Sequence, residues 1–484
     1  MATVKELLQE LDLGSSVAEF DRQLETYFIE TQPFRQLVRA QKDIVAGDKG
    51  TGKTALFRVL HKRYLTIREL SNIIVLPAFN PTGDPIFQPL AKSAVLEEAE
   101  YIQLWKAFLL SLVGNWILKH NKYRPKSALF KLDQLLRGLD LRSDTDAPPH
   151  IFSQIMTKIG KFFRWNAAEF EIGLGSDGLT FKPRVEFDKT SEDSPDVSIV
   201  AALRLLNDAL DELGKTVWVS MDRLDEAFQG FPEVEIPALR ALFRTYLDLL
   251  EFDKVRLKLF VRKDLFARII EGGFVNLTHV NAMKADVVWD EEDLLSLLCK
   301  RVKQNQDVFG KNGFDIRGTD KELFYKIFPQ KVDQGSRKPE TWVWILGRIR
   351  DGNGVTPPRN LIDLISFARE AQLRKEDREP REYDPARPLI EADALRKALL
   401  ELSKQRVNDT LLAEARDLAP VIEGFRKGKA EYNKDMIAKV LGSGPKLELQ
   451  IRKLTDLGFL EVAGGNYKIP MLYRGGLEIT QGRA

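Results

Sequence analysis

A glycine-rich stretch near the N-terminus, KDIVAGDKGTGKTALFRVL at residues 42–60, constrains the fold of this chain more than any other feature. Gly47, Gly52, Lys53 and Thr54 have the spacing G-x-x-x-x-G-K-[ST], in which a loop wraps the phosphates of a nucleotide. Glycines let the backbone turn its N–H groups inward, and the helix that follows points its positive end at the anion. The stretch therefore predicts a strand, a phosphate-binding loop and a helix, in that order.

The residues around the motif have the character that such a loop requires. Residues 42–46 include an apolar, β-prone run, and residues 55–60 continue as a helix with one apolar side. We expect the Lys53 ammonium to reach the β- and γ-phosphates and the Thr54 hydroxyl to ligate Mg²⁺. The predicted nucleotide-binding residues are Gly47, Asp48, Lys49, Gly50, Thr51, Gly52, Lys53, Thr54 and Ala55.

Length and composition exclude several classes of protein. The 484 residues are enough for roughly two to four domains. Hydrophobic residues make up 44% and charged residues 30%, which argues against global disorder. The net charge of +2 gives no whole-chain argument for nucleic-acid binding, so any such surface must be local. The single cysteine, Cys299, rules out an intrachain disulfide and fits a reducing compartment.

No segment is expected to cross a membrane. The most apolar region, residues 104–118, is too short for a bilayer and is interrupted by Lys106 and Asn115, so we interpret it as a buried helix. Residues 1–16 lack the charged-then-apolar layout of a secretion signal. The predicted location is the cytoplasm.

Apolar runs and amphipathic segments alternate along the first half of the chain. Strands are predicted at residues 42–46, 73–79, 217–221 and 255–261, and helices at 55–60, 97–121, 197–214 and 237–252. This alternation is typical of a parallel sheet with helices on both faces. The predicted fold class is α/β: a P-loop NTPase sheet flanked by helices, with a helical lid and a C-terminal winged-helix-like domain.

A second motif, VWVSMDRLDEAF at residues 217–228, places acids directly after a buried strand. A carboxylate at the end of a parallel strand suits Mg²⁺, so Asp222 is the predicted metal residue together with Thr54. Asp225 and Glu226 follow, where a carboxylate can orient or deprotonate an attacking water. We favour Glu226 for the latter role.

Two arginines are candidates for neutralising charge on the γ-phosphate. Arg262 ends the strand at 255–261, and Arg359 lies in PPRN at the start of a predicted helix, where proline suits the first turn. Arg262 has the alternative of pairing with Asp264 or Glu226 and only holding its loop. Arg359 has the alternative of a salt bridge at the surface or within the lid.

Residues 1–40 read as two short helices that end in an aromatic cluster of Tyr27, Phe28 and Phe34. Phe28 or Phe34 is a candidate for stacking on the base of a nucleotide, because the segment that enters the first strand covers the base in many such folds. Ordinary core packing is the alternative for these rings, and the one we favour.

The chain is predicted to divide into an N-terminal helical segment (1–40), a nucleotide-binding core (41–285), a helical lid (286–375) and a C-terminal domain (376–484). An insertion at about 122–195 carries a β-hairpin and either meets a partner or is a solvated decoration. Residues 373–388, LRKEDREPREYDPARP, are rich in charge and proline and are predicted to be a linker.

The C-terminal domain carries the local charge that the whole chain lacks. A helix predicted at 444–458 is followed by a small hairpin at 459–469, the layout of a winged helix. Residues 427–484 contain ten Lys or Arg and six Asp or Glu. This bias permits contact with DNA without demanding it, and docking of a protein partner is the alternative.

The motifs GDKGTGKTAL, VWVSMDRLDEAF, KLFVRKDLF and PPRNLIDLI together resemble those of bacterial P-loop ATPases of the AAA+ and STAND kind. The resemblance covers about residues 25–375 and is to a group often encoded beside antiphage defence genes. It implies that Lys53 and Thr54 bind phosphate and magnesium, and that Arg262 and Arg359 stand at the first and second sensor positions. Asp48 departs from the pattern, because relatives often carry a basic residue there.

The resemblance implies ATP rather than GTP as the nucleotide and Mg²⁺ as the cofactor. The expected activity is ATP hydrolysis that drives a switch, with Lys53, Asp222, Asp225, Glu226, Arg262 and Arg359 as the catalytic set. The alternative is a nucleotide-held regulator with little turnover that binds DNA or a protein through residues 376–484. No residue is recognisable as a trans-acting arginine finger, so the sequence does not support ring assembly.

Overall fold

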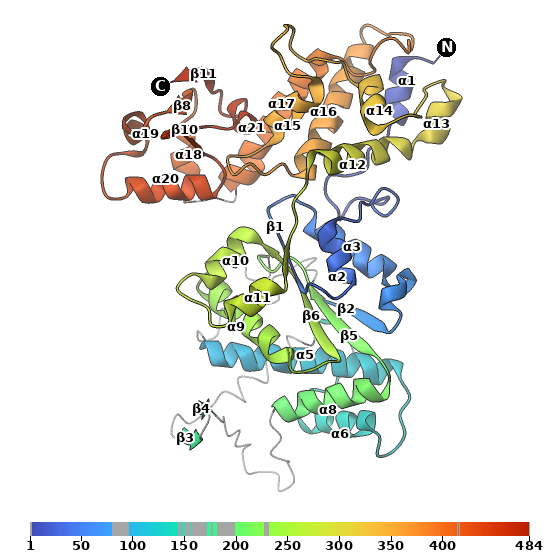
Figure 1. Ribbon diagram of the computed structural model, residues 1–484, viewed down its shortest axis with the longest axis vertical. Helices are drawn as coiled ribbons and strands as arrows, with labels where there is room; N and C mark the ends of the chain where they lie inside the picture. Colours follow the sequence, from blue (N-terminus) through green and yellow to red (C-terminus); the bar gives the residue numbers. More distant parts are fainter. Residues whose placement is uncertain are drawn as a thin grey trace. The chain divides into compact units, whose positions relative to one another are not determined.

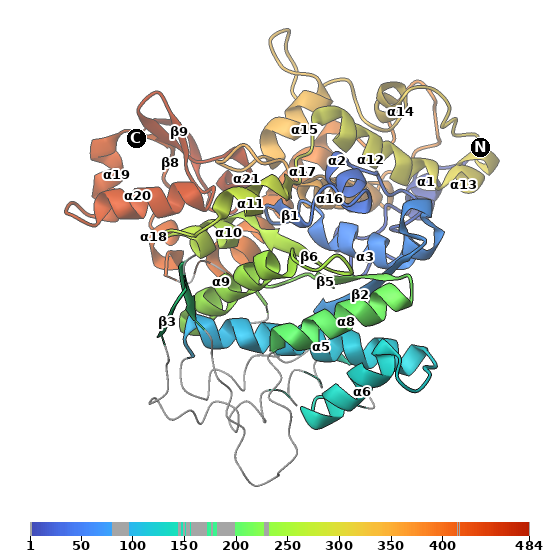
Figure 2. The same ribbon diagram turned by 60° about the horizontal axis from the view of Figure 1, so that its bottom comes forward.

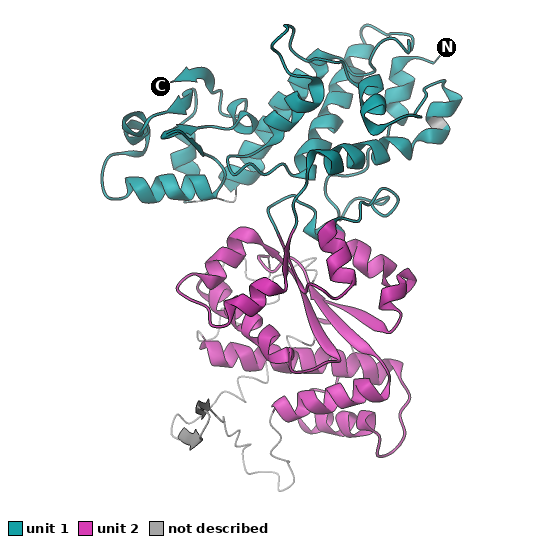
Figure 3. Cartoon of the chain, in the orientation of Figure 1, with its two compact units in different colours: residues 1–31, 47–55, 287–484 teal, residues 32–46, 56–286 magenta. Residues whose placement is uncertain are grey.

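The computed structural model describes residues 2–79, 96–143, 147–148, 151, 155, 172–175, 178–181, 199–226, 232–413, 415 and 417–483. Packing divides the chain into two compact units, which Figure 3 shows in different colours. Unit 1 comprises Met1–Thr31, Gly47–Ala55 and Val287–Ala484, and unit 2 comprises Gln32–Ala46 and Leu56–Asp286. Much of the predicted insertion lies outside the described residues.

Unit 2 is built on a five-stranded sheet in the order β2-β5-β6-β1-β7 (Figure 1). The strands are β1 (Ile44–Gly47), β2 (Ile73–Phe79), β5 (Thr216–Met221), β6 (Val255–Arg262) and β7 (Lys284–Asp286). Strand β2 pairs with β5, β5 with β6, and β1 with β7, each in parallel orientation. The four predicted strands and the parallel sheet are confirmed, and β7 is an addition.

Helices cover both faces of this sheet, as Figure 2 shows. The chain moves one way along the sheet from β1 to β2 and the other way from β2 to β5 to β6. Since parallel crossovers are right-handed, α3 (Lys53–Arg63) falls on one face, and α5 (Glu98–His120), α8 (Ile199–Glu212) and α9 (Pro232–Leu249) fall on the other. The P-loop NTPase arrangement of sheet, loop and helix is therefore the fold of this chain.

Helix α5 is the apolar segment that the sequence predicts to be a core helix. It is long and apolar enough to span a membrane by length and composition, but 83% of the relevant window is buried inside the protein. The indole N–H of Trp105 donates to the Ala238 carbonyl of α9 at 2.8 Å. Helix α5 also packs against α8 and β5, so neighbours on several sides explain why it is apolar all round.

A buried ion pair within unit 2 ties β6 to the residue that precedes β1. The Lys258 ammonium of β6 is fully buried and lies 2.5 Å from the carboxylate of Asp43, which precedes β1. Tyr246 donates to the same carboxylate at 3.1 Å, and Lys258 lies 3.8 Å from the centre of the Trp218 ring. A buried charge requires such partners, so the pair fixes β1 beside β6.

Helices make up most of unit 1. In order, they are α1 (Val4–Glu10), α12 (Glu291–Lys303), α13 (Gln306–Lys311), α14 (Asp320–Ile327), α15 (Thr341–Ile349), α16 (Pro358–Glu376) and α17 (Ala392–Arg406), followed by a π-helix at Val407–Leu412 and α18 (Ala419–Glu423). Helices α16 and α17 pack along each other and share one apolar core with α1. The helical character predicted for residues 286–375 is confirmed.

The last part of unit 1 contains a small mixed sheet in the order β11-β8-β10-β9. Its strands are β8 (Lys429–Tyr432), β9 (Glu461–Ala463), β10 (Asn466–Lys468) and β11 (Thr480–Arg483), with α19 (Lys434–Leu441), α20 (Leu447–Asp456) and α21 (Met471–Arg474) beside it. The predicted helix followed by a hairpin corresponds to α20, β9 and β10. Strands β8 and β11 are not predicted by the sequence.

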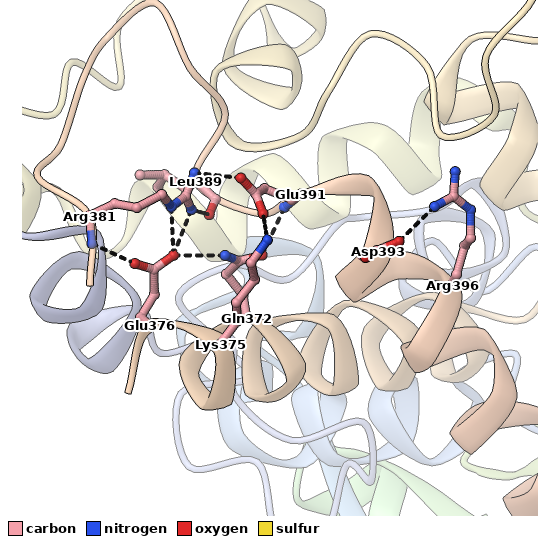
Figure 4. A network of polar contacts seen from close by, with 8 residues as sticks. All are labelled: Gln372, Lys375, Glu376, Arg381, Leu389, Glu391, Asp393 and Arg396. Carbon is pink, nitrogen blue, oxygen red and sulfur yellow. Dashed lines mark hydrogen bonds and ion pairs between the residues drawn. The ribbon is translucent and has the colours of Figure 1, made fainter. Parts of the chain in front are cut away.

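The segment predicted to be a linker is held in place by a polar network (Figure 4). The carboxylate of Glu376 accepts hydrogen bonds from Gln372 and Arg381 at 2.7 Å each. Arg381 also pairs with Glu391 at 3.0 Å, and its carbonyl accepts the N–H of Val4 at 3.0 Å. These charges are therefore paired within the fold. Unit 1 extends across the predicted domain boundary at 375/376, and residues 1–31 also belong to this unit.

Two further predictions concern individual segments. Strands β3 (Ile172–Gly175) and β4 (Gly178–Phe181) pair antiparallel, as predicted for the hairpin in the insertion; the rest of that hairpin lies outside the described residues. Of the N-terminal aromatic cluster, Tyr27 is 1% exposed and Phe34 of α2 (Gln32–Val38) is 2% exposed. For Phe34, one of the two candidates for base stacking, this burial supports core packing, the role that we favour.

Candidate phosphate-binding site

The loop that follows β1 has a shape that only glycine permits at three positions. Gly50 and Gly52 have φ of +77° and +98°, the left-handed region that L-residues rarely adopt. A Cβ at Gly47 would lie 2.5 Å from the Thr51 hydroxyl oxygen, which is closer than real Cβ atoms come. The predicted glycine pattern is therefore a backbone requirement of this loop.

Lys53 is the first residue of α3 and turns its side chain back into the loop. Its ammonium donates to the carbonyls of Gly47 and Asp48 at 2.8 and 2.9 Å. The hydroxyl of Thr51 donates to the same Asp48 carbonyl at 2.8 Å. The bend thus encloses a fixed positive charge at the N-terminus of a helix, an arrangement that attracts anions.

Arg359 lies beside the loop within the same unit, so the structure brings these two predicted elements together. The backbone N–H of Arg359 donates to the Gly50 carbonyl at 3.5 Å. A Cβ at Gly50 would lie 3.1 Å from the Cβ of Arg359 and 3.3 Å from that of Pro357. Pro357 caps α16 and Pro358 occupies its first turn, as the PPRN sequence predicts.

Trp289 is a residue at this loop that the sequence does not reveal. It follows β7 and precedes Asp290, the N-cap of α12. Its indole N–H donates to the Thr51 carbonyl at 2.8 Å. An isolated tryptophan carries no periodic signal, and the strand that leads to it was itself not predicted, so only the folded structure identifies it.

The acidic motif lies in unit 2, at the carboxyl end of β5. Asp222 is 2% exposed and directly follows Met221, the last residue of that strand. Arg223 has a φ of +56°, and its carbonyl accepts the N–H of Glu226 at 3.0 Å. A left-handed non-glycine residue costs on the order of 1–2 kcal/mol, and such strain concentrates at functional sites.

Arg262 ends β6, which is the neighbour of β5, and it pairs with carboxylates of the same unit. Its guanidinium lies 2.7 Å from Asp264 and 3.3 Å from Asp225. The predicted alternative of pairing with Asp264 is therefore realised, whereas Glu226 pairs instead with Arg223 at 3.1 Å. The ion pairs connect the ends of β5 and β6.

Glu226 has the electrostatic setting of a group that can accept a proton. Burial raises its pKa, the Asp225 carboxylate raises it further, and Arg223 opposes both effects. Glu235 of α9 also has a pKa raised by burial, and it pairs with Arg268 at 2.7 Å. Among the described residues of unit 2, Glu235 is thus a second acid with a raised pKa, and no sequence pattern selects it.

The residues of the loop in unit 1 fit the phosphates of a nucleotide, and oxygen donors for a metal are present in each unit taken by itself. The loop offers left-handed glycines, an enclosed ammonium and a helix N-terminus, which are the groups that hold phosphates. The hydroxyl of Thr54 and the carboxylate of Asp222 are hard oxygen donors, the kind that Mg²⁺ prefers.

Asp351, between α15 and α16, carries a perturbed carboxyl near the phosphate loop in unit 1. Its Oδ1 accepts the N–H groups of Asn353 and Val355 at 3.0 and 2.9 Å. Burial raises the pKa of Asp351 to about 6, with a smaller contribution from Asp48, although the two N–H groups and Arg350 oppose the shift. The negative charge of Asp48 in the loop therefore makes a small contribution to the raised pKa of Asp351.

This shift predicts a pH dependence of stability. Because the folded-state pKa of Asp351 exceeds its ordinary value of 3.8, the folded protein binds more protons than the unfolded chain between these values. The contribution of Asp351 to the free energy of unfolding is therefore fully present below pH ~4. It is lost as the pH rises through about 6, and the free energy of unfolding falls by about 3 kcal/mol at most. We expect Asp351→Asn to raise the free energy of unfolding above pH 6 and to flatten its pH profile in denaturant titrations. An unchanged profile would contradict the assignment.

Comparison with known proteins yields similarities of fold alone. No family model matches the chain, and no curated protein matches it. The Walker-type ATPase PABY2304 of Pyrococcus abyssi is 14% identical, with 97% of this chain and 100% of that chain covered and a TM-score of 0.42. The Aeropyrum pernix ORC2 protein in ADPNP–ADP complexes is 12% identical, with coverage of 94% and 95% and a TM-score of 0.43. The Aeropyrum pernix ORC1 protein in complex with DNA is 11% identical, with coverage of 94% and 96% and a TM-score of 0.33.

Proposed function

We propose that this protein is a magnesium-dependent ATPase that uses the nucleotide cycle as a switch. One observation carries the proposal: the loop of residues 47–55 encloses the Lys53 ammonium between left-handed glycines at the start of a helix. This combination is built for a polyphosphate. The strained acidic turn at residues 222–226 supplies the carboxylates that hydrolysis requires.

Each residue then has a role in positioning and charge neutralisation, which dominate phosphoryl transfer. Lys53 exchanges its backbone carbonyl partners for phosphate oxygens, and Thr54 and Asp222 hold the metal. When bound, Mg²⁺ offsets charge on the β- and γ-phosphates. Glu226 accepts a proton from the attacking water. Arg262 and Arg359 oppose the charge that develops on the γ-phosphate.

The wild-type protein provides the direct test. We expect calorimetry with Mg-ATP to show binding, and phosphate release to require Mg²⁺ and ATP together. Absence of heat at millimolar Mg-ATP would overturn the proposal. Binding without turnover would leave the second candidate described below.

A contact within unit 1 supports the proposal of a switch. The loop between α15 and α16 reaches the phosphate loop through Pro357 and Arg359. At its other end, the N–H of Gly352 donates to the Gly458 carbonyl at 2.7 Å, just after α20. The Asn353 side chain donates to the Asp456 carbonyl at 3.1 Å. This loop therefore connects the phosphate-binding residues to the helix and hairpin near the C-terminus.

We predict that Gly352→Ala breaks this connection. A Cβ there would lie 2.6 Å from the Leu460 carbonyl oxygen and 2.8 Å from that of Gly458, and backbone atoms cannot move aside easily. In the wild type, Mg-ATP should change amide hydrogen exchange in residues 447–468. In Gly352→Ala the change should be lost, while the Kd for Mg-ATP stays within a few-fold.

Gly347→Ala in α15 is the matched control, because a Cβ at Gly347 meets nothing within 4 Å. It should retain the nucleotide-dependent exchange. If Mg-ATP leaves exchange in residues 447–468 of the wild type unchanged, the C-terminal elements do not take part in the switch.

The second candidate is a nucleotide-held regulator with little turnover. Helix α20 and strands β9 and β10 have the element order of a winged helix, and they expose Leu449 and Val462, which are 53% and 57% accessible. Exposed apolar side chains among charges favour a protein partner, with DNA as the other candidate. DNA binding that weakens steeply with salt would establish phosphate contacts, and salt-insensitive or absent binding would exclude them.

We place this switch in the bacterial cytoplasm, in defence against phage, on the resemblance of its motifs. Expression of the wild type and of Lys53→Ala in a host strain, followed by phage plating, tests this setting. Protection by the wild type alone supports it, and equal plating in both strains argues against it.

A further inference from the structure

The Thr51–Gly52 peptide of the phosphate loop is held from outside by one side chain. The indole N–H of Trp289 donates to the Thr51 carbonyl at 2.8 Å, and both residues belong to unit 1. A Cβ at Gly52 would lie 4.0 Å from the Trp289 ring, so the ring is in ordinary van der Waals range of the loop. Trp289 also packs against the apolar core of this unit, which fixes its position.

Because of the geometry of the peptide bond, the hydrogen bond to the Thr51 carbonyl also sets the direction of the Gly52 N–H. A trans peptide is planar, so the carbonyl of one residue and the N–H of the next point in opposite directions. With the Thr51 carbonyl directed at Trp289, the Gly52 N–H points away from the indole. The φ of +98° at Gly52 is one that glycine adopts without steric cost, so this peptide would otherwise be free to reorient.

We propose that Trp289 is a positioning residue for nucleotide binding: by holding the Thr51 carbonyl, it keeps the Gly52 N–H directed at the bound phosphates. Phosphate-binding loops work by converging backbone N–H groups, and orientation fixed in advance lowers the cost of binding. The inference rests on the proposed nucleotide binding and adds a residue to it.

Positioning of the peptide and stacking on the base predict different effects on a ligand that has no base. If Trp289 orients a peptide toward phosphate, its loss must weaken a ligand that consists of phosphate alone. If it stacks on the base, its loss must weaken ATP and spare such a ligand. Inorganic tripolyphosphate with Mg²⁺ is therefore the deciding probe beside Mg-ATP.

The experiment measures the Kd of the full chain for both probes by calorimetry. Trp289→Phe keeps an aromatic ring and removes the donor. We expect both Kd values to rise by the same factor, about 2- to 12-fold, which is the usual range for one hydrogen bond. A second variant with β-(3-benzothienyl)alanine at position 289 replaces only the N–H by sulfur and should give the same factor, even if the phenylalanine variant folds poorly.

Trp344→Phe is the matched control, since it removes an indole hydrogen bond of 2.9 Å whose acceptor is Asp333 of the same unit rather than a residue of the loop. It should leave both Kd values unchanged. Weakening of Mg-ATP alone, or no weakening in either Trp289 variant, overturns the positioning role. If the wild type binds neither probe, both the proposed function and this inference fail. If the wild type binds and the Trp289 variants bind equally well, only this inference fails.

Discussion

Lys53→Ala is expected to abolish detectable binding of Mg-ATP. The loop holds the ammonium through the carbonyls of Gly47 and Asp48 at 2.8 and 2.9 Å. Its replacement removes charge-assisted hydrogen bonds to phosphate, and it also removes the two hydrogen bonds by which Lys53 holds the loop. Asp48 lies in the same loop, so loss of the ammonium leaves an acid that disfavours an anion there, although Arg359 still lies beside Gly50. A rise in Kd of at least about 100-fold follows if roughly 3 kcal/mol is lost.

The fold should survive this change, because alanine is the best helix former and Lys53 occupies the first position of α3. Circular dichroism and thermal unfolding check that point. Lys62→Ala is the charge-matched control, since Lys62 lies in the last turn of the same helix. It should leave the Kd unchanged. Wild-type affinity in Lys53→Ala would mean that the loop does not hold the phosphates.

The features that the sequence predicts well are local ones. Strand, loop and helix at residues 42–63 follow from glycine spacing and short-range patterning, and the structure confirms all three elements. The buried helix α5 follows in the same way, because a long apolar run with few charges must be covered. In these segments the side chains themselves carry the information.

The features that the sequence does not predict depend on partners far along the chain. Strand β7 has three residues and two of them are charged, so only its pairing with β1 makes it a strand. Trp289 reaches a carbonyl 238 residues away. The charges at residues 373–388 read as solvated, yet Arg381 finds Glu376 and Glu391. Composition does not distinguish a solvated charge from a paired one.

The candidate catalytic residues fall between these cases. Position after a strand was enough to select Asp222, Asp225 and Arg262, because parallel strands bring their ends to one edge of the sheet. The partner of each side chain was not predictable: Arg262 pairs with Asp225 as well as Asp264, and Glu226 pairs with Arg223. Such choices depend on rotamers and on the strained φ of Arg223.

Glu226→Gln is expected to retain Mg-ATP binding and to lower kcat by about 100-fold or more, the usual loss when a general base is removed. Glutamine keeps the size of the side chain and an oxygen that can accept from Arg223, which donates to Glu226 at 3.1 Å. What it removes is the proton acceptor. Steady-state phosphate release, together with the Kd from calorimetry, separates the two effects.

The pH dependence of kcat tests whether Glu226 acts as the base, because a purely structural role of Glu226 would not change it. A base acts when deprotonated, and burial raises the pKa of Glu226, so the acid limb of kcat in the wild type should lie above the ordinary pKa of 4.5. Glu226→Gln should lose that limb. Glu235→Gln is the matched comparison, because Glu235 is also an acid with a pKa raised by burial and an arginine partner at 2.7 Å. Slow turnover in Glu235→Gln with normal turnover in Glu226→Gln would transfer the role of base to Glu235.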